Sequence, residues 1–120
     1  MLHSNSKWLS TGLLVGMFAI FGVIALMLEF ERGVDAATKP KTHVVAIRNS
    51  EFSPANLTVK SGDTVVWRNY DVVPHTATGR AFDSGNLDKG QSWRFVARKK
   101  GALSYICTYH PSMKGRVIVK

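Results

Sequence analysis

The sequence has little cysteine. Cys107 is the only one among 120 residues, which excludes a disulfide within the chain. A chain this short buries little apolar surface, and small domains without disulfides usually depend on tight packing or on a metal. The lone thiol therefore calls for an explanation by reactivity, by pairing between chains or by metal ligation.

Acidic residues are also scarce. The sequence has eight Asp and Glu residues against 16 Lys and Arg residues, which gives a formal net charge of +8. The chain shows no recognition-helix pattern, aromatic RNA-binding signature or zinc-finger spacing, so nucleic-acid binding is excluded. Two interpretations of the charge stay open: a face that docks acidic proteins or anionic membranes, or a solvated surface. For the run Arg98 to Lys100 alone the solvated surface is favoured.

Charge is absent altogether from Leu9 to Leu28. A helix of this length spans roughly 30 Å, one hydrocarbon core. Residues 1–36 are therefore predicted to form one N-terminal hydrophobic helix that acts as a signal-anchor or a signal peptide. The length favours an uncleaved anchor, whereas the small residues around Ala36 permit cleavage there.

The flanking charges predict the orientation of this segment. Lys7 precedes it, and Glu29 and Glu31 follow it, so the N-terminus is expected in the cytoplasm. The residues after this segment then lie outside the cytoplasm, in the periplasm or on the outer face of the cytoplasmic membrane. They stay tethered to the membrane if the segment is uncleaved, and they are secreted to the periplasm if it is cleaved. Residues 37–41 read as a short linker, and residues 42–120 as one domain.

Short runs rich in β-branched and aromatic residues, separated by turn signals, follow the linker. They predict β-strands, and no amphipathic helix is evident. The expected strands are 43–48, 57–60, 64–68, 92–97, 101–106 and 116–120. The strands 57–60 and 64–68 flank a turn and are expected to form a hairpin-like unit, with Phe52 filling the core. The pattern favours one antiparallel β-sandwich or barrel of six to eight strands.

Three metal donors lie close together after the strand that ends near Ile106. They are Cys107, His110 and Met113, spaced C-x-x-H-x-x-M. Soft thiolate and thioether ligands favour copper, and a trigonal plane of two His and one Cys with a weak axial Met marks an electron-transfer centre. The motif therefore predicts a copper site whose second histidine comes from another part of the chain.

His75, in the segment Pro74-His75-Thr76, is the best candidate for that histidine. His43 reads as a surface residue at a strand start, and His3 lies on the cytoplasmic side of the apolar run. Taken singly, His75 is more typical of an ordinary loop histidine and Met113 of a core side chain. Combined with the unpaired thiol, they favour copper ligation.

The chain resembles the cupredoxins over nearly all of residues 42–120, and its short ligand loop is similar to that of the amicyanin subgroup. The resemblance rests on Phe52-Ser53-Pro54, Ser61-Gly62-Asp63-Thr64-Val65-Val66-Trp67, Pro74-His75-Thr76 and Tyr105 to Gly115. It implies an all-β, Greek-key β-sandwich with one copper ion near one end.

The resemblance also implies roles for individual residues. Copper would be held by His75, Cys107 and His110, with Met113 as the axial ligand. Asn69 matches a family asparagine that forms hydrogen bonds near the cysteine loop and supports the ligands from outside.

The function implied is that of a monomeric electron carrier, not an enzyme, that meets transient redox partners through His110. Pro74, Pro111 and Met113 would surround this port, and Lys114 and Arg116 would select an acidic partner. Two alternatives stay open: a copper chaperone or storage protein, and a structural β-domain with a buried cysteine.

Overall fold

The computed structural model describes residues 38–120, and within them all regular structure is β. The predicted N-terminal helix and the segment 1–36 lie outside the described residues. No helix within the described part is long and apolar enough to cross a membrane. The strands are β1 (Thr42–Arg48), β2 (Glu51–Ser53), β3 (Asn56–Val59), β4 (Thr64–Asn69), β5 (Thr78–Gly79), β6 (Ser92–Val96), β7 (Gly101–Ile106) and β8 (Lys114–Val119).

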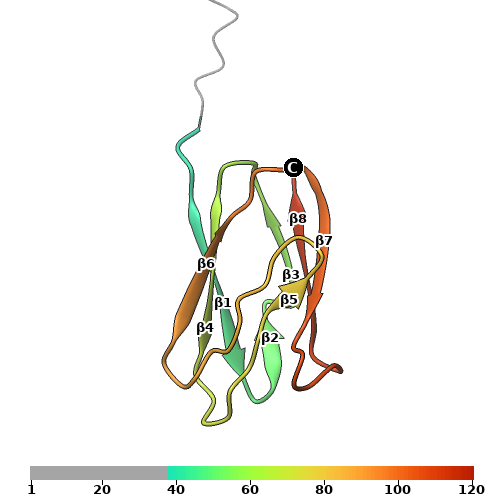
Figure 1. The fold of residues 1–120 in the computed structure, drawn as a ribbon. Helices are drawn as coiled ribbons and strands as arrows, with labels where there is room; N and C mark the ends of the chain where they lie inside the picture. Colours follow the sequence, from blue (N-terminus) through green and yellow to red (C-terminus); the bar gives the residue numbers. More distant parts are fainter. Residues whose placement is uncertain (1–37) are drawn as a thin grey trace, which may run out of the picture. The chain divides into compact units, whose positions relative to one another are not determined.

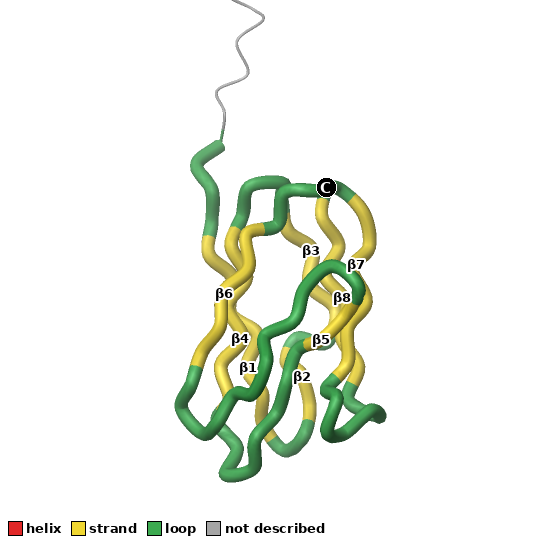
Figure 2. Tube along the Cα trace, in the orientation of Figure 1, coloured by secondary structure: helices red, strands yellow, loops and turns green. Residues whose placement is uncertain are grey.

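Two four-stranded sheets make up the domain. Their strand orders are β2-β1-β4-β6 and β3-β8-β7-β5, and Figures 1 and 2 show them face to face. The predicted β-sandwich is thus confirmed, with a strand number inside the expected range. The short strands β2 and β5 were not predicted, because two or three residues carry too little alternation to be recognised.

The predicted hairpin between residues 57–60 and 64–68 is wrong, since β3 and β4 lie in different sheets. The reason is the turn between them. The Ser61 N–H donates to the Lys120 carbonyl and the Gly62 N–H donates to the Ala97 carbonyl, so the turn bonds to both sheets while the chain crosses over. Each strand then pairs in parallel with another partner, β1 with β4 and β3 with β8. The sandwich is therefore not purely antiparallel.

The core lies between the two sheets and follows the alternation of the strands. Val45 and Ile47 of β1, Val65 and Trp67 of β4, and Val117 of β8 are fully buried. Burial of such side chains contributes roughly 1.5 to 3 kcal/mol each. Phe52 is buried as expected, at 4% exposure.

An aromatic group surrounds Trp67 in the centre of this core. Its ring centroid lies 4.9 Å from that of Phe82, 5.4 Å from Tyr105 and 5.7 Å from Trp93. Offset and edge-on pairs of this kind add to the stability that burial alone provides. The group ties β4, β6 and β7 together across the sandwich.

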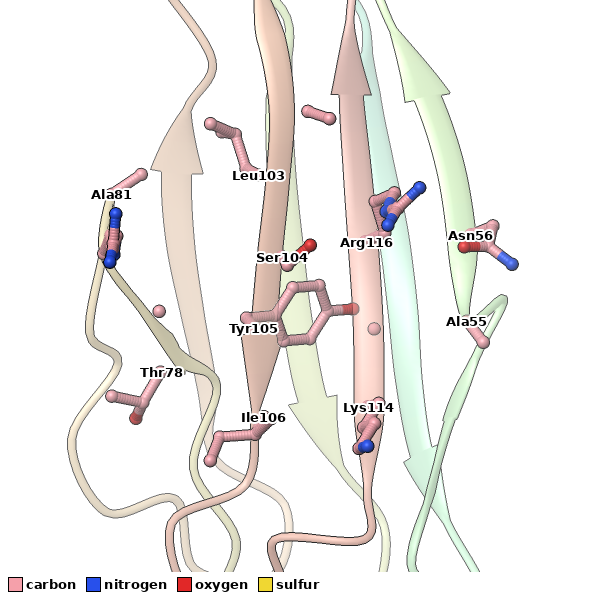
Figure 3. A pocket seen from close by; sticks show the side chains of 14 residues that line it. Ala55, Asn56, Thr78, Ala81, Leu103, Ser104, Tyr105, Ile106, Lys114 and Arg116 are labelled. Atoms are coloured by element: carbon pink, nitrogen blue, oxygen red, sulfur yellow. The ribbon is translucent and has the colours of Figure 1, made fainter.

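Tyr105 and Gly115 face each other on β7 and β8. Alternation directs position 115 inward, as it does Val117 and Val119, but the Tyr105 ring occupies that space: a Cβ built on Gly115 would overlap the ring. Figure 3 shows the ring reaching from β7 toward β8, beside a groove that Ser104 and Arg116 help to line. Burial raises the pKa of Tyr105 to about 12, so its hydroxyl stays neutral.

We expect Gly115→Ala to destabilise the domain. Because the new methyl group must displace a packed ring, the cost should be about 1 to 3 kcal/mol, measured by denaturant unfolding. Ser104→Ala, an exposed change on the neighbouring strand, should alter stability by no more than about 0.5 kcal/mol. Equal stability of the two variants would contradict this description of the core.

Asp63 closes the end of the sandwich at which the described chain begins. Its carboxylate accepts hydrogen bonds from the N–H groups of Lys41, at 2.8 Å, and Lys60, at 3.0 Å, and lies 2.9 Å from His43 Nε2. These contacts, led by the Lys41 N–H, lower the pKa of Asp63 to about 2. A carboxyl group with a depressed pKa stabilises the fold where it is ionised.

Stability should therefore fall with acidification between about pH 4 and about pH 2, as Asp63 becomes protonated. Asp63→Asn should lower the denaturation midpoint at neutral pH and remove the part of the acid-dependent loss that Asp63 contributes. Denaturant unfolding at several pH values measures both effects. Glu51→Gln, at the exposed end of β2, is the control, and an unchanged acid dependence in Asp63→Asn would contradict the role of Asp63.

Candidate metal centre

Two loops at the opposite end of the sandwich carry the predicted metal donors. Seven residues between β7 and β8 hold Cys107, His110 and Met113, and the Cys107 N–H donates to the Met113 carbonyl at 3.1 Å. The Met113 N–H donates to the His110 carbonyl at 2.9 Å, which closes the loop. His75 lies between β4 and β5 and is held by two backbone hydrogen bonds with Leu87, of 3.1 and 2.9 Å.

These loops bring three donor atoms together. Cys107 Sγ lies 3.7 Å from His75 Nδ1 and 3.7 Å from His110 Nδ1, and all three atoms lie within 4.8 Å of one another. Bond lengths of about 2.3 Å to sulfur and 2.0 Å to nitrogen, as found for zinc, place such atoms roughly 3.7 Å apart at trigonal angles. The spacing of the donors thus fits a first-row metal ion.

Burial distinguishes the donors. Cys107 and His75 are fully buried, Met113 is 4% exposed and His110 is half-buried. A sulfur-rich, largely dry donor set of this composition suits copper and not a hard cation such as magnesium or calcium. His110 is the donor nearest to solvent.

A carboxylate supports His75 from behind. Asp71 Oδ2 lies 2.8 Å from His75 Nε2, so Nδ1 is left for the metal. Metal-bound histidines commonly hold their second nitrogen in this way, which fixes the ring orientation. This role of Asp71 was not predicted, although its position four residues before His75 is a usable signal.

The turn between β1 and β2 holds this carboxylate in place. The N–H groups of Asn49 and Ser50 donate to Asp71 at 2.7 and 2.9 Å, and both residues have positive φ, 51° and 58°. Burial tends to raise the pKa of Asp71, but these hydrogen bonds and the contact with His75 together lower it. Asp71 is therefore held as a carboxylate.

Thr76 supports Cys107. Its N–H donates to Cys107 Sγ at 3.4 Å, and its hydroxyl oxygen accepts a hydrogen bond of 2.9 Å from the Thr108 N–H. Hydrogen bonds to a ligand sulfur orient it and tune the metal. This role was also missed, and the only signal in the sequence is that Thr76 directly follows His75.

Asn69 forms its side-chain hydrogen bonds around His75. Its side-chain amide donates to the carbonyl groups of Val73 and Leu87, and its oxygen accepts from the Asp71 N–H, all at 2.9 Å. The support near the cysteine loop that the resemblance implies stays a prediction. Asn69 is fully buried, so it shapes the histidine loop from inside.

Among residues 38–120 the cluster of three donors is His75, Cys107 and His110, and the competing His43 is not part of it. His43 lies beside Asp63 at the other end of the sandwich, and it is partly buried where a surface position was expected. His3 lies outside the described residues.

One groove of about 890 Å³ lies over β7 and β8 and includes Arg80, Lys114 and Arg116. His75, Cys107, His110 and Met113 do not line it, so this groove is separate from the donor cluster.

A two-sheet β-sandwich with a buried cysteine sulfur, two imidazoles and a thioether at one end is typical of mononuclear copper proteins. The chain belongs to the cupredoxin-like domain family, whose sequence model matches residues 17–119. It binds copper as its cofactor, as the predicted ligand chemistry indicated.

Amicyanins are among its relatives. The chain is 34% identical to amicyanin of Paracoccus versutus over 98 residues, which cover 75% of this chain and 74% of the relative. It is 34% identical to amicyanin of Paracoccus denitrificans over 84 residues, 64% of each chain. The predicted resemblance to amicyanin is confirmed.

Solved structures agree. A mutant amicyanin in the Cu(I) state matches with a TM-score of 0.63 and 30% identity, over 66% of this chain and 82% of that one. A purple cupredoxin from Nitrosopumilus maritimus matches with a TM-score of 0.62 and 29% identity, over 65% of this chain and 99% of that one.

We expect Asp71→Asn to weaken copper binding. Loss of the carboxylate frees the His75 ring to rotate, and such supporting contacts are typically worth about 10- to 100-fold in metal affinity. Competition with a chelator measures the affinity, and thermal unfolding of the metal-free protein shows whether the fold survives. Asp88→Asn, at an exposed turn, is the control. Unchanged affinity in a folded Asp71→Asn protein would contradict the support of His75.

Proposed function

We propose that this protein is a one-electron carrier whose copper ion is held by His75, Cys107, His110 and, axially, Met113. The observation that carries the proposal is the spacing of the three donor atoms, with His75 Nδ1 and His110 Nδ1 each 3.7 Å from Cys107 Sγ. Bound copper supplies the one-electron change between Cu(I) and Cu(II). One partner protein would deliver the electron and another would remove it.

The residues around the donors support fast transfer because they hold them before metal binds. Cys107 is positioned by Thr76, and His75 by Asp71. Donors fixed by buried hydrogen bonds need little rearrangement when the charge of the metal changes. This supports an electron carrier over a protein that takes up and releases copper.

The surface beside His110 supports a docking role. Val72 is 81% exposed and Tyr109 50% exposed, and Pro74 and Pro111 are also exposed. Small apolar surfaces of this kind suit weak, transient redox encounters. Met113, which was also expected around this port, is buried, and its burial supports the proposed role as axial ligand.

The cellular setting follows from the N-terminal segment and is part of the proposal. We propose a monomer outside the cytoplasm, anchored through residues 1–36 or released after cleavage near Ala36. Lys114 and Arg116, both exposed, would favour an acidic redox partner.

A role in copper handling is the second candidate, because a chaperone or storage protein would use the same soft donors. Full burial of Cys107 and His75 argues against ready exchange. An enzymatic role has less support: a copper-containing nitrite reductase from Thermus scotoductus matches with a TM-score of 0.64, but over only 24% of that chain.

Addition of Cu(II) to the metal-free protein should produce an intense visible copper–thiolate absorption and the EPR spectrum of a trigonal site. Cys107→Ser should abolish the colour, whereas Ser112→Ala, an exposed change in the same loop, should preserve it. A colourless complex that a chelator strips readily would overturn the carrier proposal in favour of copper handling.

A further inference from the structure

The end of the sandwich remote from the metal donors, here called the basal end, consists of residues 39–41, 60–63, 97–101 and 120. Backbone hydrogen bonds join these segments. Thr64 donates to the Lys41 carbonyl, Ser61 to that of Lys120, and Gly62 to that of Ala97. Figure 1 shows the C-terminus and the start of β1 at this end, away from the loop between β7 and β8.

The basal end gathers cations from four separate stretches of the chain. All are exposed: Lys39, Lys41, Lys60, Arg98, Lys99, Lys100 and Lys120. Its only acidic residue is Asp63, which is 4% exposed and occupied by the Lys41 N–H, the Lys60 N–H and His43. Among residues 38–120 the recorded ion pairs involve histidines alone, so these cations are not neutralised by the protein.

This arrangement changes the interpretation of the basic run Arg98 to Lys100. Alone it fits a solvated surface, but the fold adds Lys60, Lys120 and the chain entry to the same end. Gathered charge of one sign creates a field that attracts a surface of the opposite sign. The basal end therefore has the properties of a binding surface.

We propose that the basal end rests on an anionic phospholipid surface. Six of its cations are lysines, which bind phosphate as mobile point charges and do not require the paired geometry that arginine offers a carboxylate. Basic residues close to a surface of anionic lipid are attracted to its headgroups, and the attraction falls off within a Debye length.

The length of the chain before the basal end is consistent with contact between the basal end and a lipid surface. The uncharged run ends at Leu28, and Lys39 opens the basal end eleven residues later. Eleven residues reach at most about 40 Å, so a membrane-inserted run would keep the basal end close to the headgroups. The His110 end would then face away from the lipid, free for partners. The inference goes beyond the proposed carrier role and does not depend on copper, but it rests on the proposed anchoring of the chain through its N-terminal segment.

Lysine acylation footprinting of the full chain in nanodiscs tests the proposal. In discs that contain phosphatidylglycerol, Lys60, Lys99, Lys100 and Lys120 should react severalfold more slowly than in phosphatidylcholine discs. Lys89 and Lys114, outside the basal end, should react equally in both. High salt should remove the difference, because it screens exposed charges.

Two variants with the same change in charge sharpen the test. Lys60→Gln, Lys99→Gln and Lys100→Gln together should weaken lipid contact about a hundredfold and restore the reactivity of Lys120. Lys89→Gln, Arg94→Gln and Lys114→Gln together should leave Lys120 protected. Equal reactivity in the two kinds of disc would overturn the proposal. Protection that appears only when polyglutamate is added would also overturn it, in favour of an acidic protein partner.

Discussion

Thr76 provides the contact on which the rest of the metal centre depends, because it joins the two loops that carry the donors. Thr76 directly follows His75. The Thr76 N–H donates to Cys107 Sγ, and the Thr76 hydroxyl oxygen accepts from the Thr108 N–H. One residue thus fixes the position of the histidine loop relative to the cysteine loop. Because the loops follow strands of opposite sheets, this contact also ties the sheets together at the metal end.

The support of His75 shows how far such constraint extends from the site. Asp71 is held by the turn between β1 and β2, and Asn69 braces the same loop through Val73 and Leu87. The buried ring therefore rests on a chain of hydrogen bonds that begins at the edge of the first sheet. Buried polar groups tolerate little loss of partners, so this chain links the folding of that edge to the geometry of the copper ligands.

The sequence predicted features that depend on neighbouring residues better than features that depend on contacts between distant segments. The C-x-x-H-x-x-M spacing predicted donors within one loop, and alternation predicted the main strands. The crossing at Gly62 was not predicted, because a Ser-Gly-Asp turn looks the same whether it joins paired strands or two sheets. The contact of Thr76 with Cys107 was not predicted, because hydrogen bonds between distant segments leave no periodic signal. Asp71 was missed although it lies only four residues before His75.

The two ends of the sandwich divide the chemistry of the molecule. At the metal end, the buried Thr76 and the partly buried Asp71 form hydrogen bonds to the donors, and Val72 and Tyr109 are exposed on the surface. At the basal end, Asp63 binds backbone N–H groups and leaves the lysines to solvent. Strands of five to seven residues separate the ends, so a charge that collects on one end is screened from the ligands at the other. A strongly basic chain can therefore keep an apolar contact surface around His110.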